Sequence, residues 1–269
     1  MKALSLTFII LVIQLIASQK LVFGAISTIE PHLMEQKLTP LMREIEKVVD
    51  KKLVFKTGYN YEDTINKFAD GTFDLGLIGP APYIKVQNIN PHAVVILAGI
   101  KNSKESPFRS VIVSKKGSKF IKYSDLKDTT FAFGSPNSTL SYYVPKYMLK
   151  TSNTIKKIKR YVFLGRHDKI AQYVIMGKFA AGAVKQSVAI KYKKYLQVIA
   201  TSKSMPGFMI VANNKLDKKL IIKIKNLLLN LKDISVLKKI KKSVIGFEPR
   251  YDSQYDKLRE IMKEVETYK

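Results

Sequence analysis

The chain has 269 residues, 46% of them hydrophobic, which suffices for one large α/β domain or two small ones. Its formal net charge of +26 attracts anions such as nucleic acid, anionic lipid or small acidic solutes, although a general lysine-rich composition explains the charge equally well. Cysteine is absent, which excludes disulfides, thiolate metal sites, thiol catalysis and a lipidated N-terminal cysteine.

The first 18 residues have the pattern of a signal peptide. Lys2 is the charged start, an apolar run follows over residues 3–17, and Ala17 and Ser18 offer a cleavage region. The run is shorter than the roughly 20 residues that a spanning helix needs. We therefore expect export to the periplasm. A large residue three positions before the cut leaves an uncleaved N-terminal membrane anchor as the alternative.

Short apolar runs alternate with segments of helical spacing along the rest of the chain. The expected strands are residues 20–26, 53–56, 73–78, 93–100, 111–114, 130–133, 161–164, 181–184, 196–201 and 208–211. The expected helices are 31–49, 61–69, 83–87, a short one capped by Ser124, 142–149, 167–176, 187–192, 217–231, 235–242 and 253–265. This alternation predicts largely parallel sheets with helices on both faces.

The elements fall into two α/β sets, one nested inside the other. We expect a signal peptide at 1–18, a first lobe formed by 19–104 and 212–269, and a second lobe formed by 105–211. The predicted fold class is α/β, with two Rossmann-like lobes. Two connections between the lobes would act as a hinge.

One turn has the composition of an anion-binding site. In the segment FAFGSPNSTLSYYVP, residues 131–145, a buried strand ends in a hydroxyl-rich turn that opens a helix. Backbone N–H groups at a helix start have no partner within the helix, and the helix dipole favours negative charge there. Ser138, Thr139 and Ser141 add hydroxyl donors, which suit a tetrahedral oxyanion. An ordinary capped helix start is the alternative, and the nucleotide P-loop pattern is absent.

Several segments together resemble one family. FDLGLIGPAPY at 73–83, SPFRSVIV at 106–113 and GSPNST at 134–139 are followed by GRHD at 165–168 and GKFAAGAV at 177–184. In this order and spacing they resemble the phosphonate- and phosphite-binding proteins of ABC importers, the PhnD-like family. The resemblance runs from about residue 20 to 211, and more loosely to the end. It implies a type II periplasmic-binding fold with a cleft between the lobes.

The resemblance also implies ligand-binding residues. Those that match the family's positions are Tyr61, Tyr83, Ser138, Thr139, Ser141 and His167. Three further candidate ligand-binding residues follow from position or charge. Ser27 and Thr28 follow the first strand, where the cleft should lie, and Arg166 is able to pair bidentately with an oxyanion.

The chain departs from the family where aminophosphonate binders hold the substrate amine with carboxylates. The corresponding positions here are Ala180, Ser187 and Phe208. A buried ammonium without such partners costs several kcal/mol. The sequence therefore predicts a ligand without an amine.

Our leading hypothesis is a periplasmic protein that binds phosphate, phosphite or a simple phosphonate. It would act as a monomer and deliver its ligand to an ABC permease or present it to a membrane sensor protein. We expect no catalysis, cofactor, metal or nucleic acid. The alternatives are a non-phosphorus oxyanion or organic anion in the same fold, and an exported enzyme or a nucleic-acid-binding protein.

Overall fold

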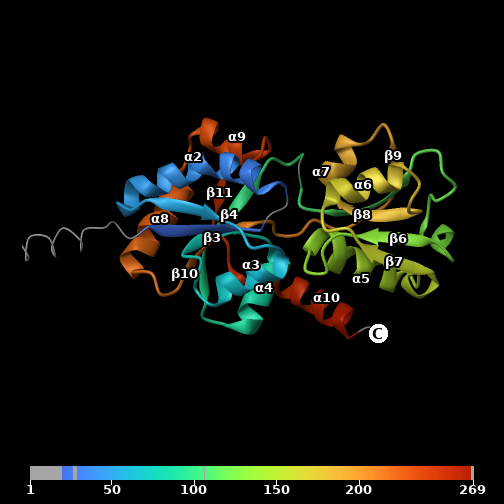
Figure 1. Cartoon of the computed structure of the whole chain (residues 1–269), viewed down its shortest axis with the longest axis horizontal. Helices are drawn as coiled ribbons and strands as arrows, with labels where there is room; N and C mark the ends of the chain where they lie inside the picture. Colours follow the sequence, from blue (N-terminus) through green and yellow to red (C-terminus); the bar gives the residue numbers. More distant parts are fainter. Residues whose placement is uncertain (1–19, 27–28, 106, 268–269) are drawn as a thin grey trace, which may run out of the picture.

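The structure is a computed structural model that describes residues 20–26, 29–105 and 107–267. The expected signal peptide at 1–18 therefore lies outside the described residues, as do Ser27 and Thr28. Two sheets with their helices form two lobes along the long axis of the molecule (Figure 1). Among the helices that are described, none is long and apolar enough to cross a membrane.

The first lobe contains a six-stranded sheet with the order β11-β4-β10-β3-β1-β2. Its strands are β1 (Leu21–Ala25), β2 (Leu53–Lys56), β3 (Leu75–Ile78), β4 (Val94–Asn102), β10 (Met209–Asn213) and β11 (Val244–Glu248). β1 is parallel to β2 and β3, whereas β10 inserts antiparallel between β3 and β4. The sheet is thus mixed rather than largely parallel, because β10 enters it from the second lobe in the opposite direction.

Helices cover both faces of this sheet (Figure 1). One face carries α2 (Pro31–Val49), α8 (Lys218–Asn230) and α9 (Ile234–Ile240), and the other carries α3 (Tyr61–Ala69), α4 (Pro80–Ile89) and α10 (Asp256–Glu266). The apolar stripe of α2 is buried against the sheet, as its helical spacing predicts. Asn60 caps α3, because its side chain accepts a hydrogen bond from the backbone N–H of Asp63 at 2.9 Å.

The second lobe contains a five-stranded sheet with the order β7-β6-β8-β5-β9. Its strands are β5 (Ser110–Lys115), β6 (Thr130–Phe133), β7 (Arg160–Phe163), β8 (Ala181–Lys185) and β9 (Leu196–Thr201). Here too the sheet is mixed, because β5 is antiparallel to β8 and β9. One face packs against α6 (His167–Ile175) and α7 (Gln186–Lys191). The other packs against α5 (Val144–Thr151), which continues from a π-helical turn at Thr139–Tyr143.

The chain crosses between the lobes twice, and the two crossings run side by side. The N–H of Ser202 donates to the carbonyl of Ser110 at 2.9 Å, and that of Met205 donates to the carbonyl of Phe108 at 3.0 Å. The sheets place the second crossing before β10, so residues 209–211 belong to the first sheet and not to the second lobe as expected. The last helix, α10, also reaches across, since Glu266 accepts from the Tyr143 hydroxyl at 2.7 Å.

Three local details differ from the sequence-based expectations. β11 was not predicted. The short 3₁₀ helix Tyr123–Leu126 is capped at Lys122 rather than at Ser124. α4 begins at Pro80 instead of residue 83, because prolines are tolerated in a first helical turn, whose N–H groups have no partner within the helix.

Candidate ligand-binding site

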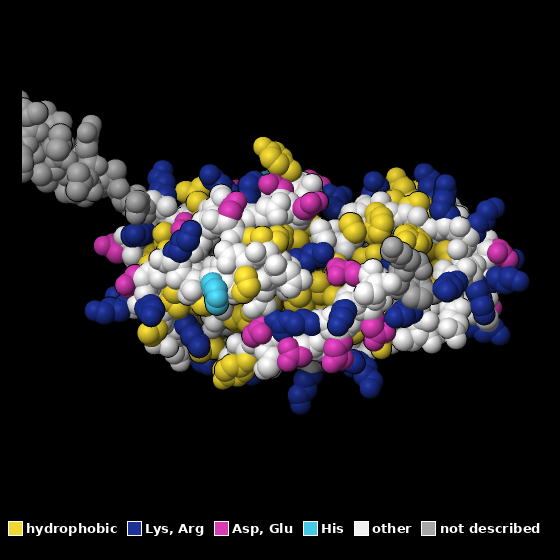
Figure 2. Space-filling model, turned by 90° about the horizontal axis from the view of Figure 1, so that it is seen from below, with side chains coloured by type: hydrophobic (Ala, Val, Ile, Leu, Met, Phe, Trp, Pro, Cys, Tyr) yellow, Lys and Arg dark blue, Asp and Glu magenta, His cyan; other side chains and the backbone are white. Residues whose placement is uncertain are grey.

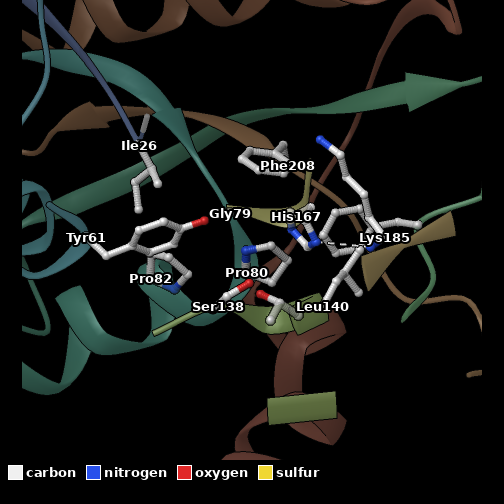
Figure 3. A pocket seen from close by; sticks show the side chains of 12 residues that line it. Ile26, Tyr61, Gly79, Pro80, Pro82, Ser138, Leu140, His167, Lys185 and Phe208 are labelled. Atoms are coloured by element: carbon white, nitrogen blue, oxygen red, sulfur yellow. Dashed lines mark hydrogen bonds between the residues drawn. The ribbon is translucent and has the colours of Figure 1, made fainter. Parts of the chain in front are cut away.

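A pocket lies between the two lobes, with a cavity of about 30 Å³. Its walls come from α3, the start of α4, the turn after β6, the start of α6, the end of β8 and the crossing segments. The lining residues are Ile26, Tyr61, Gly79, Pro80, Pro82, Phe108, Ser138, Thr139, Leu140, His167, Lys185 and Phe208. The fold thus brings together four residues that were predicted as ligand-binding: Tyr61, Ser138, Thr139 and His167 (Figure 3).

The turn after β6 holds the Ser138 hydroxyl in place. A Cβ at Gly134 would lie 2.1 Å from Ser141 Oγ, so only glycine lets the turn fold back on itself. The N–H and the hydroxyl of Ser141 both donate to Ser138 Oγ, at 3.3 and 2.8 Å. Because Ser138 Oγ accepts these two bonds, its own proton is left to donate. Ser141 is fully buried and does not line the pocket. In this structure Ser141 therefore positions Ser138.

Thr139 joins the two lobes. Pro80 and Pro82 have no backbone N–H, so Ala81 supplies a free donor in the first turn of α4. The N–H of Ala81 donates to Thr139 Oγ1 at 2.9 Å in a buried contact. Since Oγ1 is the acceptor in this bond, the Thr139 hydroxyl also retains a proton to donate.

His167 is a neutral donor at the start of α6. It is 9% exposed, and its Nδ1 accepts a hydrogen bond from the backbone N–H of Lys185 at 3.1 Å (Figure 3). This contact assigns the ring proton to Nε2. Burial, and secondarily the positive charge of Lys185, lower the pKa of His167 from its ordinary 6.5 to about 3. At neutral pH the ring is therefore uncharged and donates through Nε2.

The Tyr61 hydroxyl completes the set of donors. Burial raises the pKa of Tyr61 to about 12, and the hydrogen bond with Ser138 partly offsets this increase. The phenol keeps its proton under all physiological conditions. Four neutral groups that are able to donate hydrogen bonds thus line one pocket, and the contact between Tyr61 and Ser138 uses one of their protons until a ligand takes its place. Such an arrangement fits an oxyanion. Among the described residues, no cluster of three His, Asp or Glu side chains is placed to hold a metal ion.

Two other predicted residues lie outside the pocket. The Tyr83 hydroxyl donates to Asp252 Oδ1 at 2.8 Å, and the Tyr83 ring packs against Tyr255 at a centroid distance of 5.6 Å. Arg166 pairs with Glu30 of the first lobe and lies 3.4 Å from Asp168. Neither residue lines this pocket, and carboxylates from distant segments occupy their polar groups. Arg166 instead ties the two lobes together.

Sequence reasoning placed Phe208 beside the ligand but missed Phe108, Leu140 and Lys185. Phe108 and Phe208 come from the two crossings and meet edge to face, with ring centroids 5.8 Å apart. Leu140 follows Thr139 in the same turn. Lys185 ends β8, and the sequence offered a signal for it: ligands in open α/β sheets bind beyond the carboxyl ends of parallel strands.

Burial of the neutral His167 predicts acid-sensitive stability. The unfolded chain binds a proton near pH 6.5 and the folded protein only near pH 3, so the contribution of His167 is complete above pH 6.5 and is lost as the pH falls toward 3. We expect a loss of about 2 kcal/mol in unfolding free energy between pH 6.5 and pH 5. Urea unfolding at both pH values measures it. His167→Gln should remove most of this loss, and His92→Gln, on an exposed residue, should not. Identical pH dependence in the two variants would contradict the assignment.

Two α/β lobes joined by two crossings, with a donor-lined pocket between them, define a type II periplasmic-binding protein. The periplasmic aliphatic sulphonate binding protein SsuA of Escherichia coli has this fold, with a TM-score of 0.62, 14% identity and 92% of each chain covered. The model of the family described as "ABC transporter, phosphonate, periplasmic substrate-binding protein" matches residues 23–255. The chain therefore belongs to this family, whose members are binding proteins and not enzymes. The predicted family and fold class are confirmed.

Individual relatives agree with this assignment. The probable ABC transporter phosphite binding protein PhnD1 of Prochlorococcus marinus is 28% identical over 174 residues, which span 61% of this chain and 58% of that protein. The structure of PhnD1 from the same organism in complex with methylphosphonate has a TM-score of 0.81 at 23% identity and covers 93% of this chain and 99% of that one. A binding protein component of an ABC phosphonate transporter from Pseudomonas aeruginosa has a TM-score of 0.80 at 20% identity, covering 92% and 86%.

Proposed function

We propose that this protein captures a phosphorus oxyanion, namely phosphate, phosphite or a simple phosphonate, and delivers it to an ABC permease. The observation that carries the proposal is the convergence of four neutral donors, from Tyr61, Ser138, Thr139 and His167, on one pocket between the lobes. Hydrogen bonds from neutral donors bind an anion without neutralising it, and they are stronger than bonds between two neutral groups. The phosphite and methylphosphonate named for PhnD1 support the same ligand class.

We further propose that the lobes close around the ligand. The first lobe would consist of residues 19–104 together with the C-terminal part of the chain from β10 onward. The second lobe would run from residue 105 to the second crossing. Two contacts support closure, the bond from Ala81 to Thr139 and the ion pair between Glu30 and Arg166, because each joins residues of different lobes. Opening would break both and expose the pocket. Export through the segment at 1–18 would place the mature protein in the periplasm.

The spread of positive charge argues against nucleic acid as the main partner. On the face that Figure 2 shows, Lys and Arg side chains are distributed over both lobes and interleaved with Asp and Glu. A nucleic-acid interface needs a continuous basic stripe or patch. The presence of neighbouring permease and ATPase genes would favour transport, whereas a neighbouring sensor kinase gene would favour signalling.

Calorimetric titration with phosphate, phosphite, methylphosphonate, sulfate, arsenate and 2-aminoethylphosphonate tests the function. We expect at least one of the first three ligands to bind, and to bind more tightly than sulfate. Tighter binding of sulfate or an organic anion would favour the alternative ligand class. Failure of every phosphorus compound to bind would refute the proposal.

The same titration tests the prediction about the amine. By the family resemblance, Ala180, Ser187 and Phe208 stand where aminophosphonate binders have carboxylates. Lys185 lines the pocket. An ammonium group would find no negative partner there and would face a positive charge. We expect 2-aminoethylphosphonate to bind at least tenfold more weakly than methylphosphonate. Equal or tighter binding of the amine would overturn the correspondence of these positions.

A further inference from the structure

A second and larger cavity adjoins the donor-lined pocket. It measures about 230 Å³ and shares Phe108, Leu140, Lys185 and Phe208 with the first pocket. Three of these four side chains are apolar, so a largely apolar boundary, here called the neck, lies between the two spaces. In Figure 3 the Lys185 side chain extends away from Ser138 and alongside Phe208. A ligand whose oxyanion occupies the first pocket would extend a substituent into the second by passing between these side chains.

The walls of the second cavity carry positive charge from both lobes. Lys37 and Lys241 lie on the first lobe, and Arg109 and Lys185 lie on the second. None of the described residues that line this cavity is Asp or Glu. Like charges thus face each other across the cleft, and their repulsion opposes closure. An anionic group bound between them would attract the cations of both lobes and so favour closure.

Two side chains of these walls, Arg109 and Gln186, each have a buried polar atom without a hydrogen bond among the described residues. Arg109 Nε and Gln186 Oε1 are buried without a hydrogen bond, and Lys185 forms no ion pair there. Buried polar groups of native proteins are almost always paired, so unpaired groups require an explanation. The Gln186 amide is able to rotate and present its NH₂ group instead of its oxygen. Arg109 and Gln186 both line the cavity, so unused hydrogen-bonding capacity lies beside it.

The electrostatics agree with this geometry. Burial lowers the pKa of Lys185, and the charges of Lys241 and Lys37 lower it further, while Asp168 acts in the opposite direction. Burial also lowers the pKa of Lys241. Both ammonium groups are therefore held where their charge is unfavourable, and a bound anion would relieve that cost.

We propose that the second cavity binds an acidic group at the far end of the same ligand, so that the preferred ligand is a phosphonate or phosphate monoester whose short carbon chain ends in a carboxylate or a second phosphoryl group. This inference rests on the proposed function, because the phosphorus oxyanion must occupy the first pocket. The carbon chain would lie in the neck between Phe108, Leu140 and Phe208. Lys185 and Lys241, from opposite lobes, would hold the terminal acid.

Titration with ligands of matched length tests the proposal. The ligands are methylphosphonate, propylphosphonate, 3-phosphonopropionate and 1,3-propanediphosphonate. We expect at least one of the two acids to bind tenfold or more tightly than propylphosphonate, which fills the neck without a charge. The two acids distinguish a carboxylate terminus from a phosphoryl terminus. Equal affinity of both acids and propylphosphonate, with methylphosphonate bound normally, overturns the inference and leaves the proposed function intact.

A charge-matched pair of variants identifies the cations responsible. Lys37→Met with Lys241→Met should reduce the preference for the acid to less than threefold, while methylphosphonate affinity stays within threefold of the unaltered protein. The control is Lys219→Met with Lys225→Met, which removes the same charge from the exposed face of α8 and should keep the preference. A preference that persists in the first variant, or disappears in the control, assigns the effect to general charge and overturns the site. Failure of all four ligands to bind the unaltered protein refutes the proposed function, and the inference with it.

Discussion

Replacing Ser138 with alanine together with Thr139 with valine is expected to weaken methylphosphonate binding by roughly two or more powers of ten. Each hydroxyl oxygen is engaged as an acceptor, Ser138 by Ser141 and Thr139 by Ala81. Each hydroxyl is therefore able to donate its proton to the ligand, which for Ser138 replaces the contact with Tyr61. Hydrogen bonds to charged groups contribute about 1.5–3 kcal/mol each. At about 1.4 kcal/mol per power of ten, the loss of both bonds accounts for the expected change.

The control is Lys156→Gln with Lys157→Gln, which removes two positive charges from exposed positions of the second lobe. Its affinity for methylphosphonate should stay close to that of the unaltered protein at low and moderate salt, because distant exposed charges are screened. Thermal unfolding of both variants shows whether the fold is intact, since Thr139→Val also leaves the Ala81 N–H without its acceptor. A hydroxyl variant that binds normally beside a lysine variant that fails would move the site elsewhere.

Replacing His167 with asparagine is expected to weaken binding by roughly ten- to a hundredfold, the range that corresponds to one hydrogen bond to a charged group. The asparagine oxygen is able to take the place of Nδ1 and accept from the Lys185 N–H, but it leaves nothing at the position of Nε2. Glutamine is able to place its NH₂ group near Nε2 instead. We therefore expect His167→Gln to bind more tightly than His167→Asn in titrations with methylphosphonate.

The two variants should differ in the opposite sense in stability. His167→Asn keeps an acceptor for the buried Lys185 N–H, whereas His167→Gln leaves that N–H unsatisfied, which costs about 1–3 kcal/mol. Urea unfolding at pH 7 measures the difference. If His167→Asn binds as tightly as His167→Gln, then Nε2 does not donate to the ligand, and the ring has only a structural role.

Local patterns in the sequence predicted most elements of the fold. The helix at 31–49, the strand at 53–56 and the helix at 61–69 begin and end where the structure places them. Their signals are short-range: apolar residues at helical spacing for the two helices and a short apolar run for the strand. The turn with Ser138 and Thr139 was likewise recognisable, because a strand, a hydroxyl-rich turn and a helix start all lie within one continuous segment.

The sequence could not predict which distant segments meet. The direction of β10 and the pairing of β11 depend on the path of the chain between the lobes, and neither leaves a local signal. Tyr83 and Arg166 resemble ligand-binding residues in sequence, yet Asp252 and Glu30, far away along the chain, occupy their polar groups. Composition and motifs thus predicted the family, the fold class and four residues that meet in the pocket between the lobes.

Tertiary structure alone decided the second cavity. Its cations come from α2, the first crossing, the end of β8 and the segment after α9, which no sequence spacing connects. Only the packing of the two lobes places Lys37 and Lys241 opposite Arg109 and Lys185. Charge at a site depends on distances in space, whereas a sequence specifies only distances along the chain. The excess of lysine in the composition therefore indicates a particular binding site only once the structure shows which lysines lie together between the lobes.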